Sequence, residues 1–217
     1  MRAPKAVIFG VVLAVALTPA AILVVLAVTW TPVAVVSGPL EDALDAYESG
    51  DYATTLRLFQ PLAERGDAAA QYGLGVMYER GQGVRQNDVK AVKWYRLAAK
   101  QGDAKAQSNL GLMYANGDGV PQDHAEAGKW FRLAAVQGNA EALSNLGYMY
   151  GHGRGIQQDY VLAHIWFTLA ASRFPPGEEH DNAAKGQDWA AKHMTPAQIA
   201  KAQKLASEWK PLREQAD

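Results

Sequence analysis

The chain has 217 residues, of which 49% are apolar, and its 21 lysines and arginines nearly balance 22 aspartates and glutamates, for a formal net charge of −1. The basic residues are scattered rather than gathered in a stripe, which argues against nucleic acid as a partner. The chain contains no cysteine, so disulfides, thiolate metal sites, a thiol nucleophile and a lipid-modified cysteine are excluded.

The first 37 residues form an apolar segment. Residues 6–30 carry no charged side chain, and about 20 such residues suffice to cross a hydrocarbon core. Arg2 and Lys5 precede this run and acids follow it, so the positive-inside rule predicts a cytoplasmic N-terminus and places the rest across the membrane. We expect a transmembrane anchor at 1–37. A cleaved signal peptide is the alternative, because residues 14–16 form a small-residue cleavage site.

From residue 66 onward the sequence repeats itself. Three blocks of 36 residues, 66–101, 102–137 and 138–173, align without a gap, which is the signature of a repeat protein. Each block holds two apolar patterns with helical spacing, the first built on Ala, Leu, Met and Tyr and the second on Ala, Trp, an aromatic residue and Ala. Neither helix can bury its apolar face alone. The pattern therefore predicts an all-α solenoid of antiparallel helix pairs.

A glycine-containing loop joins the two predicted helices of each block, and in the second block it reads GDGVPQD, residues 117–123. Gly117 suits a left-handed helix C-cap and Asp123 suits the N-cap of the next helix. We therefore predict a positive φ at Gly117, an N-cap hydrogen bond to Asp123, and no bound ion or phosphate in this loop.

Glycine also recurs in the middle of each first helix, where it costs about 1 kcal/mol against alanine. We predict that close approach of alanines on the second helix offsets this cost, and that the tryptophans belong to the core rather than to a ligand site. The residues concerned are Gly75, Gly111 and Gly147, the alanines Ala98, Ala134 and Ala170, and the tryptophans Trp94, Trp130 and Trp166.

The second block carries a specific signature. It reads AxAQxNLGxMYxxGxGVxQD from Ala104 to Asp123 and closes with WFRLAA from Trp130. This signature resembles the Sel1-like repeats, short relatives of tetratricopeptide repeats, and the resemblance covers residues 66–173. It implies a right-handed superhelical solenoid, preceded here by the N-terminal transmembrane helix.

The resemblance extends to both flanks of the repeats. Residues 38–65 resemble a tetratricopeptide-like helix pair, and residues 174–217 resemble the capping helices that close bacterial members of the family. Thr195, Pro196 and Gln198 independently predict the start of the last helix, as an N-cap, a first-turn proline and a capping-box glutamine.

The resemblance also implies a function. It points to a non-catalytic scaffold or adaptor that binds a protein or peptide in its concave groove, in envelope signalling or complex assembly. For a bacterial source we expect an inner-membrane protein with periplasmic repeats, or a periplasmic protein after signal cleavage. Two alternatives stay open: a cell-wall-related or β-lactam-hydrolysing enzyme built on the same repeats, and an organiser of a membrane complex that acts through its span.

The sequence lacks the usual catalytic motifs, including HExxH, GxSxG and GxxxxGK[ST]. We therefore expect no catalytic residue, no metal and no small-molecule cofactor. Five histidines share no ligand spacing and are predicted to lie at the surface or rim: His124, His152, His164, His180 and His193.

In a helical-pair solenoid the first helices line the concave side, so the positions between their apolar residues are candidate partner contacts. The strongest are Asn109 and Asn145, which share a repeat position where the first block has Gly73. An amide there can bond a bound peptide backbone, or alternatively the neighbouring repeat. The other candidates are Tyr72, Lys105, Ser108, Leu112, Glu141, Ser144 and Tyr148, with Val76, Glu79, Arg80, Asn116 and His152 as further exposed positions.

Overall fold

The computed structural model describes residues 38–211, and this part of the chain is helical without strands. The predicted anchor at residues 1–37 lies outside the described residues. Of the helices described, none combines the length and apolarity that crossing a membrane requires. The helices are α1 (Pro39–Glu48), α2 (Tyr52–Glu64), α3 (Ala68–Arg80), α4 (Asp88–Lys100), α5 (Ala104–Asn116), α6 (His124–Ala135), α7 (Ala140–His152), α8 (Tyr160–Arg173), α9 (Glu178–Ala191) and α10 (Pro196–Glu208).

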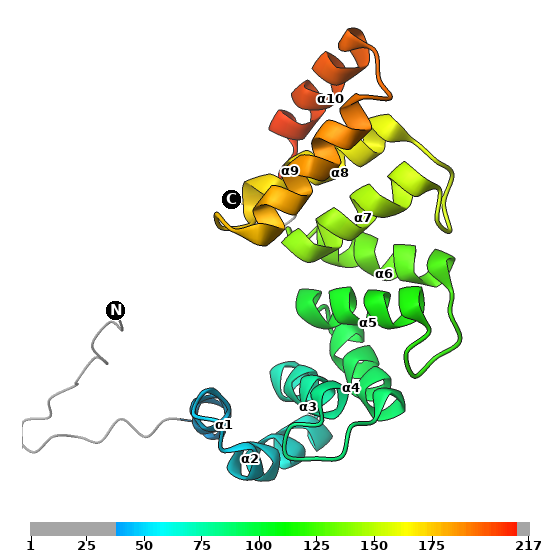
Figure 1. Ribbon diagram of the computed structural model, residues 1–217. Helices are drawn as coiled ribbons and strands as arrows, with labels where there is room; N and C mark the ends of the chain where they lie inside the picture. The colour runs from blue at the N-terminus through cyan, green and yellow to red at the C-terminus, as the bar shows by residue number, and fades with distance from the viewer. Residues whose placement is uncertain (1–37, 212–217) are drawn as a thin grey trace, which may run out of the picture.

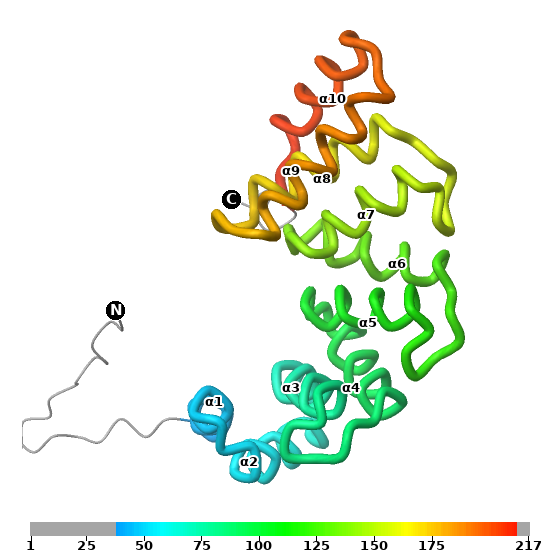
Figure 2. The backbone as a smooth tube through the Cα atoms, viewed as in Figure 1, coloured from blue at the N-terminus to red at the C-terminus, as the bar shows by residue number. Residues whose placement is uncertain are grey.

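Consecutive helices form pairs that stack into an arc. α3 packs on α4, α5 on α6 and α7 on α8, while α4 contacts α5 and α6 contacts α7 across the repeat boundaries. The pairs follow one another along a curved path (Figure 1), and the backbone trace shows the long loops together on one side of it (Figure 2). This arrangement confirms the all-α solenoid; the right-handed sense of the superhelix stays a prediction.

The loop between the two helices of each repeat has the predicted caps. Gly117 ends α5 with a φ of 85°, and Asp123 accepts a hydrogen bond from the Glu126 amide at 2.9 Å. Gly81 and Gly153 end α3 and α7 in the same left-handed conformation. Because glycine adopts this conformation without a Cβ clash, each first helix stops at the same repeat position.

The second glycine of the loop has a different role. Gly119 has a φ of 68°, and a Cβ placed on it would lie 2.4 Å from the backbone carbon of Asp88. Gly155 meets the backbone of His124 in the same way. Each loop therefore packs against the start of the second helix of the preceding repeat, so the loops contribute to stacking as well as to the turn.

The glycines in the first helices pack against aromatic rings, and the predicted alanine partners were wrong. A Cβ on Gly111 would lie 2.6 Å from the Phe131 ring, and one on Gly75 would lie 2.5 Å from Tyr95. The predicted alanines are buried, but the atoms nearest to each glycine belong to the ring that follows the tryptophan. These alanines are Ala98, Ala134 and Ala170. A flat ring lying on bare backbone brings the two helices close, which explains why glycine recurs there.

Two further side chains differ from prediction. His164 is 2% exposed, so the expectation that every histidine lies at the surface or rim was wrong for this one. Trp130 packs against the core but stays half-buried, whereas the neighbouring Phe131 is 1% exposed. The core ring of each repeat is thus the residue that follows the tryptophan.

The C-terminal helices close the array. Thr195 and Gln198 form the predicted capping box at the start of α10. α9 packs along α8 as the first helix of a further repeat would, but α10 folds back onto α8. Leu169 of α8 belongs to the same buried cluster as Ala202 and Ala206 of α10, so α10 covers a surface that the preceding repeats leave open.

Candidate binding groove

Three hollows follow one another along the first helices. The central hollow, of about 400 Å³, lies between α3, α5 and α7. The N-terminal hollow, of about 550 Å³, lies between α1, α3 and the start of α5. The C-terminal hollow, of about 440 Å³, lies between α7 and α9. Tyr72, Arg80 and Lys105 line both the N-terminal and the central hollow, so these two are continuous. The three hollows together are called the concave groove.

Most of the predicted contact residues line one of these hollows. Tyr72, Lys105, Asn109 and Glu141 meet in the central hollow, although they come from three different repeats. The C-terminal hollow brings together Ser144, Asn145, Tyr148 and His152. The first helices therefore bring predicted positions from different repeats together in these hollows, and their contact with a partner stays a prediction.

Three predicted positions do not present an exposed side chain to these hollows. Ser108 is fully buried, so its predicted exposure was wrong: its short side chain lies beneath the surface that the neighbouring repeats form. Val76 lines the N-terminal hollow but is only 7% exposed, which makes it part of the wall. Leu112 is 38% exposed and lines none of the three hollows.

The two candidate amides have different surroundings. The Asn109 side chain lies beside the Tyr95 hydroxyl and acts to lower its pKa, while that hydroxyl donates a hydrogen bond to a Glu79 carboxylate oxygen. Burial, with the Glu79 carboxylate, holds the pKa of Tyr95 well above its ordinary value. At the corresponding position of the next repeat stands Phe131, which has no hydroxyl to engage Asn145. Asn109 thus faces a side chain of the preceding repeat, and Asn145 is the amide better placed to meet a partner.

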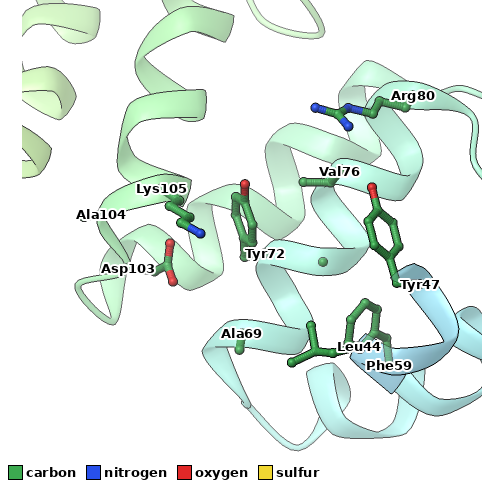
Figure 3. A pocket seen from close by; sticks show the side chains of 11 residues that line it. Leu44, Tyr47, Phe59, Ala69, Tyr72, Val76, Arg80, Asp103, Ala104 and Lys105 are labelled. Atoms are coloured by element: carbon green, nitrogen blue, oxygen red, sulfur yellow. The ribbon is translucent and has the colours of Figure 1, made fainter. Parts of the chain in front are cut away.

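Tyr72 stands where the N-terminal and central hollows of the groove meet. Burial raises its pKa, and the carboxylates of Glu141 and Asp103 raise it further. The hydroxyl therefore stays protonated at neutral pH and can donate a hydrogen bond to a bound acceptor. In Figure 3 the Tyr72 ring stands between Lys105 and Val76.

Sequence reasoning missed the N-terminal hollow. Its floor is the Phe59 ring, and a Cβ on Gly73 would lie 2.4 Å from that ring. Leu44 and Tyr47 of α1 form the opposite wall, as Figure 3 shows. The available signal was Gly73 itself, since the other two blocks have asparagine there.

Sequence reasoning also missed a stack of rings beside the C-terminal hollow. His152 lies between Tyr148, at 4.2 Å between ring centroids, and Trp189, at 4.7 Å. Tyr160 stacks on His193 at 4.4 Å and meets the edge of Trp189. Trp189 also occupies the space above Gly151. The stack joins α9 to α7 and α8 through these rings, while Tyr148 stays 41% exposed.

Comparisons with known proteins agree with this architecture. The Sel1 repeat profile matches residues 68–103, 104–139 and 140–173. A Sel1 repeat protein from Oxalobacter formigenes is 30% identical, with a TM-score of 0.65 over 77% of this chain and 69% of its own. A protective antigen of uropathogenic Escherichia coli that displays an SLR fold is also 30% identical, with a TM-score of 0.64 over 77% of this chain. The match spans 39% of that antigen's length. A search of curated proteins found no match.

Proposed function

The chain belongs to the Sel1 repeat family, whose fold commonly serves protein–protein interaction, and we propose that it is a scaffold that binds a protein segment in its concave groove. The observation that carries this proposal is the convergence of Tyr72, Lys105 and Glu141, from three successive repeats, on one hollow. A surface that spans three repeats suits an extended segment better than a compact small molecule.

The chemistry of the groove supports the same proposal. The Tyr72 hydroxyl can donate a hydrogen bond, the Asn145 amide can both donate and accept one, and Lys105 adds a cation. Backbone groups of an extended peptide require donors and acceptors at intervals, which side chains from successive repeats supply.

We further propose that residues 1–37 place the repeats beyond a membrane, in the periplasm for a bacterial source. The absence of cysteine allows a direct test with the single variant Lys100→Cys, at an exposed position of α4. A membrane-impermeant maleimide applied to intact cells is expected to label this cysteine. The intact mass of the mature protein then separates a retained anchor from a cleaved signal peptide, and labelling only after lysis would contradict the proposal.

Site-specific cross-linking in cells tests the groove. A photoreactive amino acid at position 145 is expected to form a cross-link to a defined partner protein. The matched control is position 129, because Lys129 is exposed on α6 outside the three hollows. Asn145 is preferred to Asn109 because the Asn109 side chain already faces the Tyr95 hydroxyl. Equal cross-linking from both positions, or none from position 145, would refute groove binding.

A further inference from the structure

The floor of the N-terminal hollow is an aromatic ring packed on bare backbone. Gly73 takes the place of Asn109 and Asn145, and the Phe59 ring lies where a side chain at position 73 would stand. The walls are largely apolar, formed by Leu44, Tyr47 and Val76. Leu44 is 45% exposed, so part of this apolar surface faces solvent. At about 550 Å³, the hollow has room for a large apolar side chain, and its lining suits one.

Two cations border this hollow on the side that faces the central hollow. Arg80 and Lys105 are exposed, and neither forms an ion pair with any residue that the structure describes. Three acids lie nearby, of which Glu141 is exposed and lines the central hollow beside the cations, and the other two are already engaged. Glu79 accepts a hydrogen bond from Tyr95, and Asp103 caps α5 by accepting one from the Ala106 amide at 2.7 Å.

Tyr72 connects the apolar and the cationic parts. Its ring lines both hollows, and in Figure 3 it stands between the apolar wall and Lys105. An extended chain has side chains about 3.3 Å apart along its axis. An apolar residue and an acidic residue within two or three positions of each other can therefore reach both parts at once.

We propose that the groove selects a protein segment in which a large apolar residue is followed or preceded closely by an acidic residue. The apolar side chain enters the N-terminal hollow between α1 and α3, and the carboxylate pairs with Arg80 and Lys105. This inference rests on the proposed function, since it names the chemistry of the segment that the groove binds. Charge complementarity selects the acid, and the apolar lining of the N-terminal hollow selects the apolar anchor.

Selection from a random dodecapeptide library, displayed on phage and panned against the full chain in detergent micelles, tests the proposal. Enriched sequences are expected to combine a large apolar residue with Asp or Glu within three positions. A synthetic copy of the best peptide is expected to bind Leu44→Ser and Lys105→Glu at least fivefold more weakly. Replacing the peptide's acid with lysine is expected to restore binding to Lys105→Glu.

Matched controls separate local effects from misfolding. Leu205 on α10 is 43% exposed, close to the 45% of Leu44. Lys129 is an exposed lysine on α6. Leu205→Ser and Lys129→Glu are expected to leave peptide affinity unchanged. Because the tested residues are exposed, each variant should keep the melting temperature of the parent chain within a few degrees.

The possible outcomes distinguish this inference from the proposed function on which it rests. If selected peptides cross-link at position 145 but bind Leu44→Ser and Lys105→Glu as tightly as the parent chain, the inference fails and groove binding stands. If no peptide is enriched, or the enriched peptides bind outside the groove, both fail. A dimer of the chain that Leu44→Ser dissociates would make a second copy the occupant, and would overturn the proposed segment.

Discussion

At the scale of single residues, Gly119 both adopts a left-handed backbone conformation and allows close contact with the preceding repeat. Its φ is 68°, and an added Cβ would meet the Asp88 backbone at 2.4 Å. Gly102 also has a positive φ, of 93°, but nothing lies within 4 Å of its would-be Cβ. We expect Gly102→Ala to cost about 1 to 2 kcal/mol, from the left-handed conformation alone.

Gly119→Ala is expected to cost roughly 1 to 3 kcal/mol more than Gly102→Ala, because backbone on both sides of the contact must move. Urea denaturation of the two variants measures the difference. Equal losses would mean that the loop makes no close contact with the preceding repeat.

His164 is the residue whose titration should affect stability. It is buried on α8, and burial lowers its pKa while Asp188 on α9 acts in the opposite direction. Its neutral form is thus favoured in the folded state, and the unfolded chain binds the proton more readily. Stability from this residue is present above the ordinary pKa of 6.5 and is lost as the pH falls below it.

The measurement is the free energy of unfolding between pH 7.5 and pH 5.5, within about one unit on either side of the ordinary histidine pKa. The parent chain is expected to lose stability over this range, and His164→Gln is expected to lose less. Comparing the two slopes removes the contribution of the other histidines. Parallel slopes would show that His164 keeps an ordinary pKa in the folded protein.

At the scale of helices, a buried glutamine links each of the first two repeats to the helix pair before it. Gln107 of α5 donates to the Ala99 carbonyl of α4 at 3.0 Å, and its own carbonyl accepts from Gln137 at 2.9 Å. Gln71 makes the corresponding bonds with Ala63 and Gln101. The third repeat has Leu143 at this position, also fully buried.

Because the third repeat carries Leu143, substitutions at Gln107 separate the contribution of hydrogen bonding from that of packing. Gln107→Leu keeps most of the side-chain volume and copies the third repeat, so we expect a loss of only about 1 kcal/mol from the hydrogen bonds. Gln107→Ala is expected to lose about 2 to 4 kcal/mol, because it also leaves a cavity. Thermal or urea unfolding of both variants checks the order, and a reversed order would mean that the bonds outweigh packing.

The sequence predicted helices and caps well, because both are local. The spacing of apolar residues within one block, with Gly117 and Asp123 at its loop, specifies where two helices begin and end. The partner of Gly111 was not predictable from spacing, since which ring lies on the glycine depends on how the helices cross. The burial of Ser108 likewise depends on neighbouring repeats.

The hollows were less predictable than the helices, for the same physical reason. Each is lined by residues from different repeats, so its shape depends on the stacking of pairs and not on any one pattern. The difference between Gly73 and Asn109 was visible in the sequence. Its meaning required the position of Phe59, which belongs to the helix pair before the repeats.

At the scale of the whole molecule, the array ends where α10 covers its last repeat. Leu97, Leu133 and Leu169 occupy the same repeat position, and the first two are 38% and 48% exposed whereas Leu169 is 5% exposed. The helix α10 makes this difference, because its Ala202 and Ala206 join the cluster that contains Leu169. A terminal unit that covers an apolar face is expected of a solenoid.

Leu169→Ala is therefore expected to cost about 2 to 5 kcal/mol, as a buried truncation does. Leu133→Ala, at the same position one repeat earlier, should change stability by no more than about 0.5 kcal/mol. Because each repeat contacts only its neighbours, hydrogen exchange in Leu169→Ala should rise in α8 and α10 while α3 stays protected. A uniform rise along the chain would instead mean that the array unfolds as one cooperative unit, with the C-terminal helix stabilising every repeat rather than the last.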